Sequence, residues 1–341
     1  MGARRVAIAA VLATAFLGAA ATAGVLVGPA GLPARGVLEA LGARLPLVPL
    51  DSPLSATQET IVFDLRLPRV ALGALVGAML AVAGGAYQGV FDNPLADPYL
   101  LGIAAGAGLG ATLVIAYGPA DAASTLLLPA AAFAGAAGSV GMTCAVGRAG
   151  GRGATGLILA GVTVAAFLTA AQTFVQQRNA DTIRDVYGWL LGQLDTSGWP
   201  DVWLVVPYAA VAAALILAHA RPLDVLRVGD EEAAALGVDV TRVRLVVVVA
   251  ATIGTAAAVA VSGLIGFVGI IVPHAIRLLV GGSYRVLIPL SLVAGAGFLV
   301  VADVLARTLL APAELPIGVV TAFCGGPFFA VVLRTSRLVS A

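Results

Sequence analysis

Nine long stretches of the chain contain no charged residue, and they limit its possible folds more than any other feature. A helix rises about 1.5 Å per residue, so about 20 apolar residues cross the bilayer's hydrocarbon core, which is about 30 Å thick. Charge-free apolar runs of this length predict transmembrane helices. The stretches are residues 6–34, 70–91, 98–120, 122–147, 153–177, 202–220, 245–276, 286–302 and 315–333.

The stretch 245–276 is longer than one span needs, and Ser262–Gly263 near its middle offers a break, which makes ten spans. Cytoplasmic loops carry the excess of basic residues, which tests this division. With ten spans and both termini inside, twelve arginines lie inside and seven outside, whereas a single span at 245–276 removes the excess. The inner set is Arg4, Arg5, Arg148, Arg152, Arg221, Arg227, Arg242, Arg244, Arg277, Arg285, Arg334 and Arg337, and the outer set is Arg35, Arg44, Arg66, Arg69, Arg178, Arg184 and Arg307.

The composition supports one membrane-embedded domain. Hydrophobic residues make up 60% of the chain and charged residues 11%, against about 45–50% and about 25% in soluble domains. Small residues recur four apart within the spans, as at Gly102, Gly106 and Gly110, which lets helices approach closely in lipid. We therefore expect an all-α membrane protein with about ten transmembrane helices in one compact bundle, and residues 1–341 as a single transmembrane domain.

Other segments fit this arrangement. Arg4–Arg5 with the following apolar run is also typical of a secretory signal peptide, but the run is long for one, so we expect a retained span. Segments 28–65 and 178–201 predict short surface or interfacial helices outside the membrane. The sequence Ala-Val-Ala-Gly at 81–84, ten residues before Pro94, is echoed by Ala-Val-Ser-Gly at 260–263 before Pro273. The two copies run in opposite directions, which predicts inverted-repeat character, although so short a match also arises by chance.

Two connections between spans carry candidate functional residues. In the loop 91–98, Asp97 can cap the following helix with Pro98 at its first position, while Leu95 is an apolar residue on a turn. The loop is a tight turn, and Leu95 also suits the closing of a pore. The largest inner loop, 222–243, predicts a short amphipathic helix that begins at the acidic run Asp230–Glu232 and ends at Gly237. Such a helix either docks a partner protein or is a solvent-exposed helix within the loop that has no partner.

Charged residues gather at the ends of spans on the outer side. Asp64, Arg66 and Arg69 precede the second span, Asp303 and Arg307 end the ninth, and Glu314 precedes the tenth. Arginine forks suit carboxylates on a docking protein. Snorkelling and an internal Asp303–Arg307 pair at i,i+4 spacing explain the same residues.

Several classes of function are disfavoured. The chain has no lysine, so it has no P-loop, and its net charge of +1 attracts no nucleic acid. No carboxylate lies mid-membrane, which disfavours an ion-coupled carrier, and HExxH is absent. Cys144 and Cys324 lie inside apolar runs and are expected to be small buried side chains, and His219 and His274 are interpreted as packing residues, so no metal site and no catalytic residue is expected. Energy for any transport has to come from a partner.

Ordered motifs from about residue 60 onward resemble the permease family of ABC importers for vitamin B12, iron-siderophores and haem. They are RLPR at 66–69, Gln88, NPLADP at 93–98, Leu101–Gly102, LAGV at 159–162, GDEEAAALG at 229–237, GLIGFVG at 263–269, PHAIR at 273–277, Ala302–Asp303 with Arg307, ELPIG at 314–318 and Gly326–Pro327. One departure is Asp92, where many relatives have a basic or neutral residue.

The resemblance implies a homodimer in the cell membrane, with multiple spans and both termini cytoplasmic. Two cytoplasmic ATPase subunits would hold ATP and Mg, an extracytoplasmic binding protein would deliver cargo, and this chain would be no enzyme and need no cofactor. By motif, the binding protein would dock on Arg66, Arg69 and Arg307, while Asn93, Leu95 and Thr155 would form the cytoplasmic gate, Thr155 lying in a loop before its span. The coupling helix for the ATPase, within 222–243, would comprise Gly229, Asp230, Glu231, Glu232, Ala233, Ala234, Leu236 and Gly237.

The expected cargo is a large metal chelate. An iron(III)-siderophore is the default, and cobalamin or haem import by the same scaffold is the alternative. An ion-coupled secondary transporter is the competing class outside this family.

Overall fold

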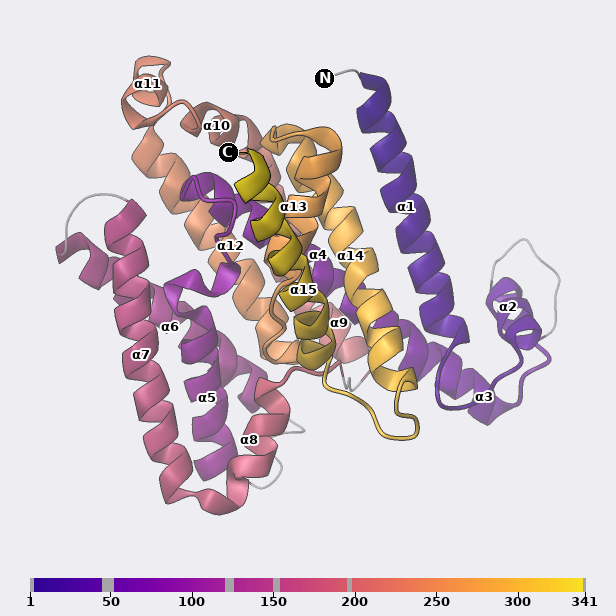
Figure 1. Ribbon diagram of the computed structural model, residues 1–341. Coiled ribbons are helices and arrows are strands. Elements are labelled where there is room, and N and C mark those ends of the chain that lie inside the picture. The colour runs from indigo at the N-terminus through magenta and orange to yellow at the C-terminus, as the bar shows by residue number, and fades with distance from the viewer. Residues whose placement is uncertain (1–2, 45–51, 120–125, 150–153, 195–197, 340–341) are drawn as a thin grey trace.

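The computed structural model describes residues 3–44, 52–119, 126–149, 154–194 and 198–339, and these residues form helices and their connections without a β-strand. Figure 1 shows the helices gathered into one elongated bundle. They are α1 (Ala3–Leu26), α2 (Ala34–Ala43), α3 (Ala56–Thr60), η1 (Ile61–Arg66), α4 (Leu67–Val90), η2 (Pro98–Leu101), α5 (Ile103–Tyr117), α6 (Leu127–Ala149), α7 (Ala154–Arg178), η4 (Ala180–Thr182), α8 (Ile183–Leu190), α9 (Trp199–Ala218), α10 (Ala220–Leu226), α11 (Asp230–Ala235), α12 (Val240–Ser262), α13 (Val268–Val280), α14 (Tyr284–Thr308) and α15 (Ile317–Val339).

Ten of these helices occupy the predicted spans. Seven are long and apolar enough to cross a bilayer: α1, the continuous helix through α3, η1 and α4, and α6, α7, α9, α12 and α14. Three shorter apolar helices, α5, α13 and α15, fill the remaining predicted positions. The expected all-α membrane fold is confirmed. The predicted surface segments also contain short helices, namely α2, α3, η1, η4 and α8.

Some predicted boundaries differ from the structure. Helix α1 ends at Leu26, so the apolar residues 27–33 are a connection rather than membrane helix. The stretch 98–120 begins with the 3-10 turn η2, and the helix proper starts at Ile103. Arg152 and the parts 45–51 and 195–197 of the predicted surface segments lie outside the described residues.

The predicted break at Gly263 divides the longest stretch into α12 and α13. Gly263 ends α12 with φ of 63°, a left-handed conformation that glycine adopts at little cost. The hydroxyl of Tyr99 donates to the carbonyl of Ile265 at 3.0 Å and accepts from its N–H at 3.1 Å, which holds the extended link before α13. Gly84, its partner in the sequence echo, instead lies inside α4, so the two copies have different local structures.

Helix α4 is the centre of the bundle and packs against α14, α12 and α13. Glycine makes this possible, because an added Cβ at Gly77 would overlap the backbone of Gly295 in α14. In the same way, an added Cβ at Gly84 would overlap the backbone of Gly269 in α13. The predicted small-residue packing is therefore what brings the central helices together.

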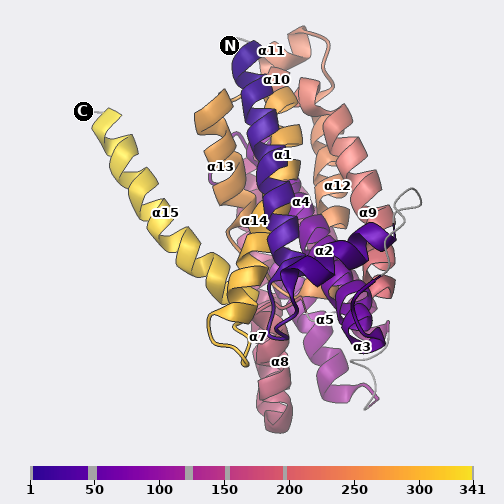
Figure 2. The ribbon, with the colours of Figure 1, turned by 90° about the vertical axis from the view of Figure 1, so that its right-hand side faces the viewer.

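Both chain ends and the helices α10 and α11 lie at the same end of the bundle, as Figure 1 shows. This end is called the terminal end below. Helices α2, α3 and α8 lie toward the opposite end, called the distal end. An even number of spans requires the two termini to share a side. In Figure 2, α15 leans away from α13 and α14 toward its C-terminus.

Candidate functional site

The loop 222–243 folds at the terminal end as α10, α11 and their connections. Gly229, with φ of 112°, precedes α11, and Gly237, with φ of 84°, follows it, so glycines bound the helix at both ends as its sequence predicts. Ala233 is fully buried against the bundle, whereas Leu236 is 70% exposed. The exposed remainder of the segment comprises Asp230, Glu231, Glu232, Ala234 and Gly237. The segment therefore presents a small acidic and apolar surface.

Two ion pairs hold this segment to the bundle, and sequence reasoning missed both. Asp224 of α10 accepts from the N–H of Tyr284 at 2.6 Å and from the hydroxyl of Ser283 at 2.7 Å, so it caps the first turn of α14. Arg285 adds an ion pair to Asp224 at 3.3 Å. The second pair joins Asp230 to Arg244 of α12 at 2.6 Å. The partners of Asp224 lie about 60 residues along the chain and Arg244 lies 14 residues after Asp230, so neither pair has the short spacing that a sequence reveals.

The loop 91–98 is a compact turn at the C-terminus of α4. The side chain of Asn93 accepts from the N–H of Leu95 at 2.9 Å, which fixes the turn and leaves Leu95 43% exposed. Asp97 caps η2 by accepting from the N–H of Tyr99 at 2.8 Å, as the sequence predicts. Burial raises the pKa of Asp97 to about 6, and the hydrogen bond from Tyr99 only partly offsets it.

Thr155 lies in the first turn of α7 rather than in a loop, because α7 begins at Ala154. The predicted loop location is therefore wrong, since the helix starts directly after residue 153. The Thr155 side chain is exposed. Helix α7 packs against η2, where an added Cβ at Gly161 would overlap the carbonyl of Leu100. Thr155 and the loop 91–98 are thus carried by elements that contact each other, and its role in a gate stays a prediction.

Charged side chains from α4, α14 and the α14–α15 connection meet at the distal end. Arg69 donates to Asp303 at 2.9 Å and to Glu314 at 2.7 and 3.1 Å. Arg307 lies 3.3 Å from Asp303, so the i,i+4 pair that the sequence offers does form. Asp303 is 1% exposed, so two arginines balance its charge inside the bundle.

Arg66 and Arg307 also bind the C-terminus of α1. Arg66 donates to the carbonyls of Val25 at 2.9 Å, Leu26 at 3.0 Å and Ala30, and Arg307 donates to the carbonyl of Gly24. The last carbonyls of a helix lack intrahelical partners, and cations there are favourable. The exposed fractions are only 5% for Arg66 and 2% for Arg307. The predicted docking arginines are therefore brought together, but all three already have partners within the chain.

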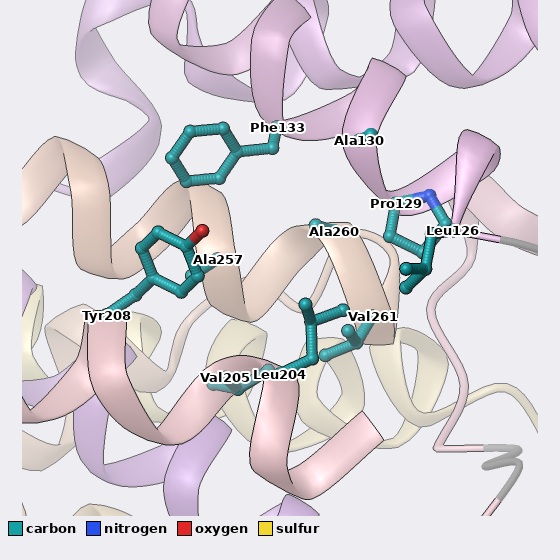
Figure 3. Close-up of a pocket in the computed structure, with 10 residues that line it drawn as sticks. All are labelled: Leu126, Pro129, Ala130, Phe133, Leu204, Val205, Tyr208, Ala257, Ala260 and Val261. Atoms are coloured by element: carbon teal, nitrogen blue, oxygen red, sulfur yellow. The ribbon is translucent and has the colours of Figure 1, made fainter. Parts of the chain in front are cut away.

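A cavity of about 240 Å³ lies between α6, α9 and α12, and Figure 3 shows its lining. Phe133 and Tyr208 pack against each other at one side, with ring centres 5.5 Å apart and ring planes tilted by 50°. The lining is almost wholly apolar: Leu126, Pro129, Ala130, Phe133, Leu204, Val205, Tyr208, Ala257, Ala260 and Val261. The hydroxyl of Tyr208 is the one polar side-chain group among these residues, so the lining contains no set of metal ligands.

Metal-ligating residues do not gather anywhere in the described part of the chain, where no group of three His, Cys, Asp or Glu side chains occurs. His274 packs edge-on against Phe328, with ring centres 5.6 Å apart, and the Nδ1 of His219 lies 2.7 Å from the carbonyl of Leu215. Both contacts agree with the packing roles expected for these histidines. The prediction that Cys324 is buried is wrong, because its side chain is exposed on α15.

Comparison with known proteins agrees with the geometry. The FecCD transport family matches residues 6–335. The chain belongs to the FecCD transport family. The BtuC permease of the cobalamin import system of Halobacterium salinarum is 42% identical over 287 residues, which cover 84% of this chain and 76% of that protein. The FhuB permease of the iron(3+)-hydroxamate import system of Bacillus subtilis is 40% identical over 281 residues, or 82% of this chain and 73% of that protein.

A solved structure gives the same fold for this FecCD family member. It is described as an inward-facing metal-chelate type ABC transporter and matches with a TM-score of 0.80 at 28% identity. The match covers 95% of this chain and 97% of that one. The family resemblance predicted from the sequence motifs is confirmed.

Proposed function

We propose that this FecCD family member is the membrane-spanning permease of an ATP-driven importer whose cargo is a bulky metal chelate. The observation that carries the proposal is the family match over residues 6–335, together with relatives named as permeases of cobalamin and iron-hydroxamate import systems. The structure supports it with a multi-helix bundle and separate charged clusters at the two ends. Transport, not chemistry, is the proposed activity of this chain.

The proposed partners are a second copy of the chain, two ATPase subunits that bind ATP and Mg, and an extracytoplasmic binding protein. The exposed Leu236, which follows α11 directly, supports ATPase docking, since docking surfaces combine apolar and charged groups. Phe323 of α15 and Phe167 of α7 are 77% and 68% exposed, and a second copy is the proposed cover for these apolar side chains. In this scheme the terminal end is cytoplasmic and the chain is a multi-pass protein of the cell membrane.

The proposed mechanism is alternating access. Closure of the ATPase subunits moves α11, and the movement opens or closes the gate formed by Asn93, Leu95 and Thr155 on the cytoplasmic side. On the outer side the binding protein docks at the cluster of Arg66, Arg69 and Arg307. In the structure Arg66 and Arg307 cap α1, so docking of acidic groups there competes with the carbonyls of α1. Cargo passes along the subunit interface without a tight site in the membrane.

The first cargo to test is an iron(III)-siderophore, and cobalamin and haem are the alternatives. The two relatives named above differ by only two points of identity, 42% and 40%, so similarity alone does not choose between corrinoid and siderophore. The rival class, an ion-coupled carrier, is disfavoured because the buried Asp303 is paired with Arg69 and Arg307.

The deciding experiment isolates the chain from its native membrane, identifies copurifying subunits, and measures uptake into proteoliposomes. We expect a P-loop ATPase to copurify with the chain. Three radiolabelled chelates are tested: a ⁵⁵Fe-hydroxamate, ⁵⁷Co-cobalamin and ⁵⁵Fe-haem. We expect one of them to be taken up, and its uptake to require ATP. Uptake driven by an ion gradient without ATP would refute the proposal. Ala234→Pro, which breaks α11, should abolish uptake while the dimer still elutes intact.

A further inference from the structure

Arg244 joins three elements at the terminal end of the bundle. Its two terminal nitrogens donate to the two carboxylate oxygens of Asp230 at 2.6 and 2.8 Å, and its Nε donates to the carbonyl of Val90 at 3.3 Å. A guanidinium that grips a carboxylate through two parallel hydrogen bonds holds it in one orientation. One side chain of α12 therefore ties the start of α11 to the end of α4.

The two groups that Arg244 binds lie at the ends of helices. Asp230 is the first residue of α11, and Val90 is the last residue of α4. The carbonyl of a last helical residue has no partner within its own helix, so an arginine is a natural donor to it. Asn93 and Leu95 lie three and five residues after Val90 in the loop 91–98, so this contact holds the end of α4 that leads into the loop.

The other links from α11 to the bundle make no hydrogen bond or ion pair with α4 among the described residues. The covalent connection through Gly237 and Asp239 leads to α12, where Asp239 caps the helix. The connection through Gly229 leads to α10, which reaches α4 by packing of Leu223 near Gly89. Buried Ala233 packs into the apolar core without a directional contact. Among the described residues, Asp230–Arg244 is the only ion pair made by α11.

We propose that Arg244 is the positioning residue that transmits movement of α11 to the gate loop 91–98. The inference rests on the proposed function, in which α11 docks an ATPase subunit. The guanidinium binds the carboxylate of Asp230 through its two terminal nitrogens and the carbonyl of Val90 through Nε. A displacement of α11 therefore also displaces the end of α4. If Arg244 only stabilised the structure, its loss would affect folding and ATPase attachment but not the response of the gate loop. Experiment can separate this stabilising role from transmission of movement.

The experiment uses the complex with the ATPase that copurifies with the unmodified chain, in a background where Cys144 and Cys324 are replaced by alanine. Leu95→Cys reports on the gate loop through its rate of labelling by a fluorescent maleimide, with and without Mg-ATP. We expect Mg-ATP to change this rate at least threefold. Arg244→Met should reduce the change to less than 1.5-fold, while ATPase copurification and ATP hydrolysis stay within twofold.

The matched control is Arg242→Met. Arg242 lies two residues away on the same helix, is exposed, and its side chain makes no hydrogen bond or ion pair within the described residues. It should leave the response of Leu95→Cys to Mg-ATP unchanged. A response to Mg-ATP in Arg244→Met equal to that of the control overturns the inference, as does the loss of ATPase copurification from this variant.

A charge exchange separates transmission of movement from the stabilising role. Asp230→Arg with Arg244→Asp restores the ion pair, but aspartate cannot donate to the Val90 carbonyl. We expect this double variant to copurify ATPase normally and still to lack the response at residue 95, and full recovery of the response would overturn the inference. If no ATPase copurifies with the unmodified chain, the proposed function fails instead. If ATPase is present but residue 95 never responds to Mg-ATP, only the inference about Arg244 fails.

Discussion

Arg66 has a structural task at the C-terminus of α1, and this leads to a first prediction. Arg66→Met removes the donor to the carbonyls of Val25, Leu26 and Ala30. Leaving buried acceptors without partners should lower the free energy of unfolding by about 1–3 kcal/mol. Thermal unfolding in detergent, followed by tryptophan fluorescence, measures the change.

The control is Arg35→Met, because the Arg35 side chain is 92% exposed and, within the described residues, pairs only with Glu39. An exposed pair contributes little, so this variant should unfold like the parent. Equal stability of both variants would contradict the capping role of Arg66. Arg66 would then be free to serve the binding protein alone.

Asp97 supplies a prediction about pH. Burial raises its pKa to about 6 in the folded chain, above the usual value of 3.8, so the ionised form is disfavoured in the fold. The stability contributed by its protonated form is therefore complete below pH 3.8 and is lost as the pH rises through about 6. Asp97→Asn keeps an acceptor for the N–H of Tyr99 and removes this loss. The unfolding temperature of Asp97→Asn should exceed that of the parent at pH 7.5, and the difference should shrink as the pH falls and vanish below pH 3.8.

A difference in unfolding temperature that stays constant between these pH values would show that Asp97 titrates normally. Tyr99→Phe offers a comparison, since it removes the hydroxyl that bridges Ile265 but leaves the Asp97 carboxyl in place. Its pH dependence should match that of the parent.

At this scale the sequence predicts only local contacts. The cap by Asp97 and the Asp303–Arg307 pair follow from spacings of a few residues, and both form. Asp224 and Arg244 were missed because their partners are brought near by packing, with 154 residues separating Arg244 from Val90. The burial of Arg66 was missed for the same reason.

At the scale of helices, absence of charge predicts which segments cross the membrane but not where each helix ends. The spans were found because charges in hydrocarbon are costly, and the break at Gly263 because the stretch was too long. The ends at Leu26 and Ile103 were missed, since residues 27–33 and 98–102 are apolar although they are not regular α-helix. A helix end is defined by where the backbone hydrogen bonds stop, and the hydropathy of the sequence does not show this.

Close packing between helices gives a third prediction. An added methyl at Gly84 would overlap the backbone of Gly269, which cannot move as a side chain end can. Gly84→Ala should therefore separate α4 from α13 and cost about 1–3 kcal/mol. Gly138 in α6 has no atom within 4 Å of an added Cβ, so Gly138→Ala is the matched control.

Gly138→Ala should be neutral or slightly stabilising, because alanine favours helix by up to about 1 kcal/mol over glycine. Unfolding temperatures of both variants, measured in the same detergent, decide the matter. If Gly84→Ala is as stable as Gly138→Ala, then α4 and α13 do not depend on glycine for their contact.

At the scale of the whole molecule, α4 and α14 carry contacts at both ends of the bundle. At the distal end they hold Arg69, Asp303 and Arg307. At the terminal end the N–H of Tyr284 donates to Asp224 of α10, and the carbonyl of Val90 accepts from Arg244, which also binds Asp230 of α11. The two helices pack closely through Gly77 and Gly295. They therefore form a physical link between the proposed docking surfaces for the binding protein and for the ATPase.

This link gives a last prediction, since it requires the two charged clusters to lie on opposite sides of the membrane. With Cys144 and Cys324 replaced by alanine, Leu236→Cys marks the terminal end and Ala313→Cys the distal end, and both positions are exposed. A membrane-impermeant maleimide should label residue 313 in intact cells and residue 236 only in inverted vesicles, because the excess of arginines lies at the terminal end. Labelling of residue 236 from outside would invert the molecule, place α11 beyond the reach of any cytoplasmic ATPase, and contradict the proposed function together with the role of Arg244.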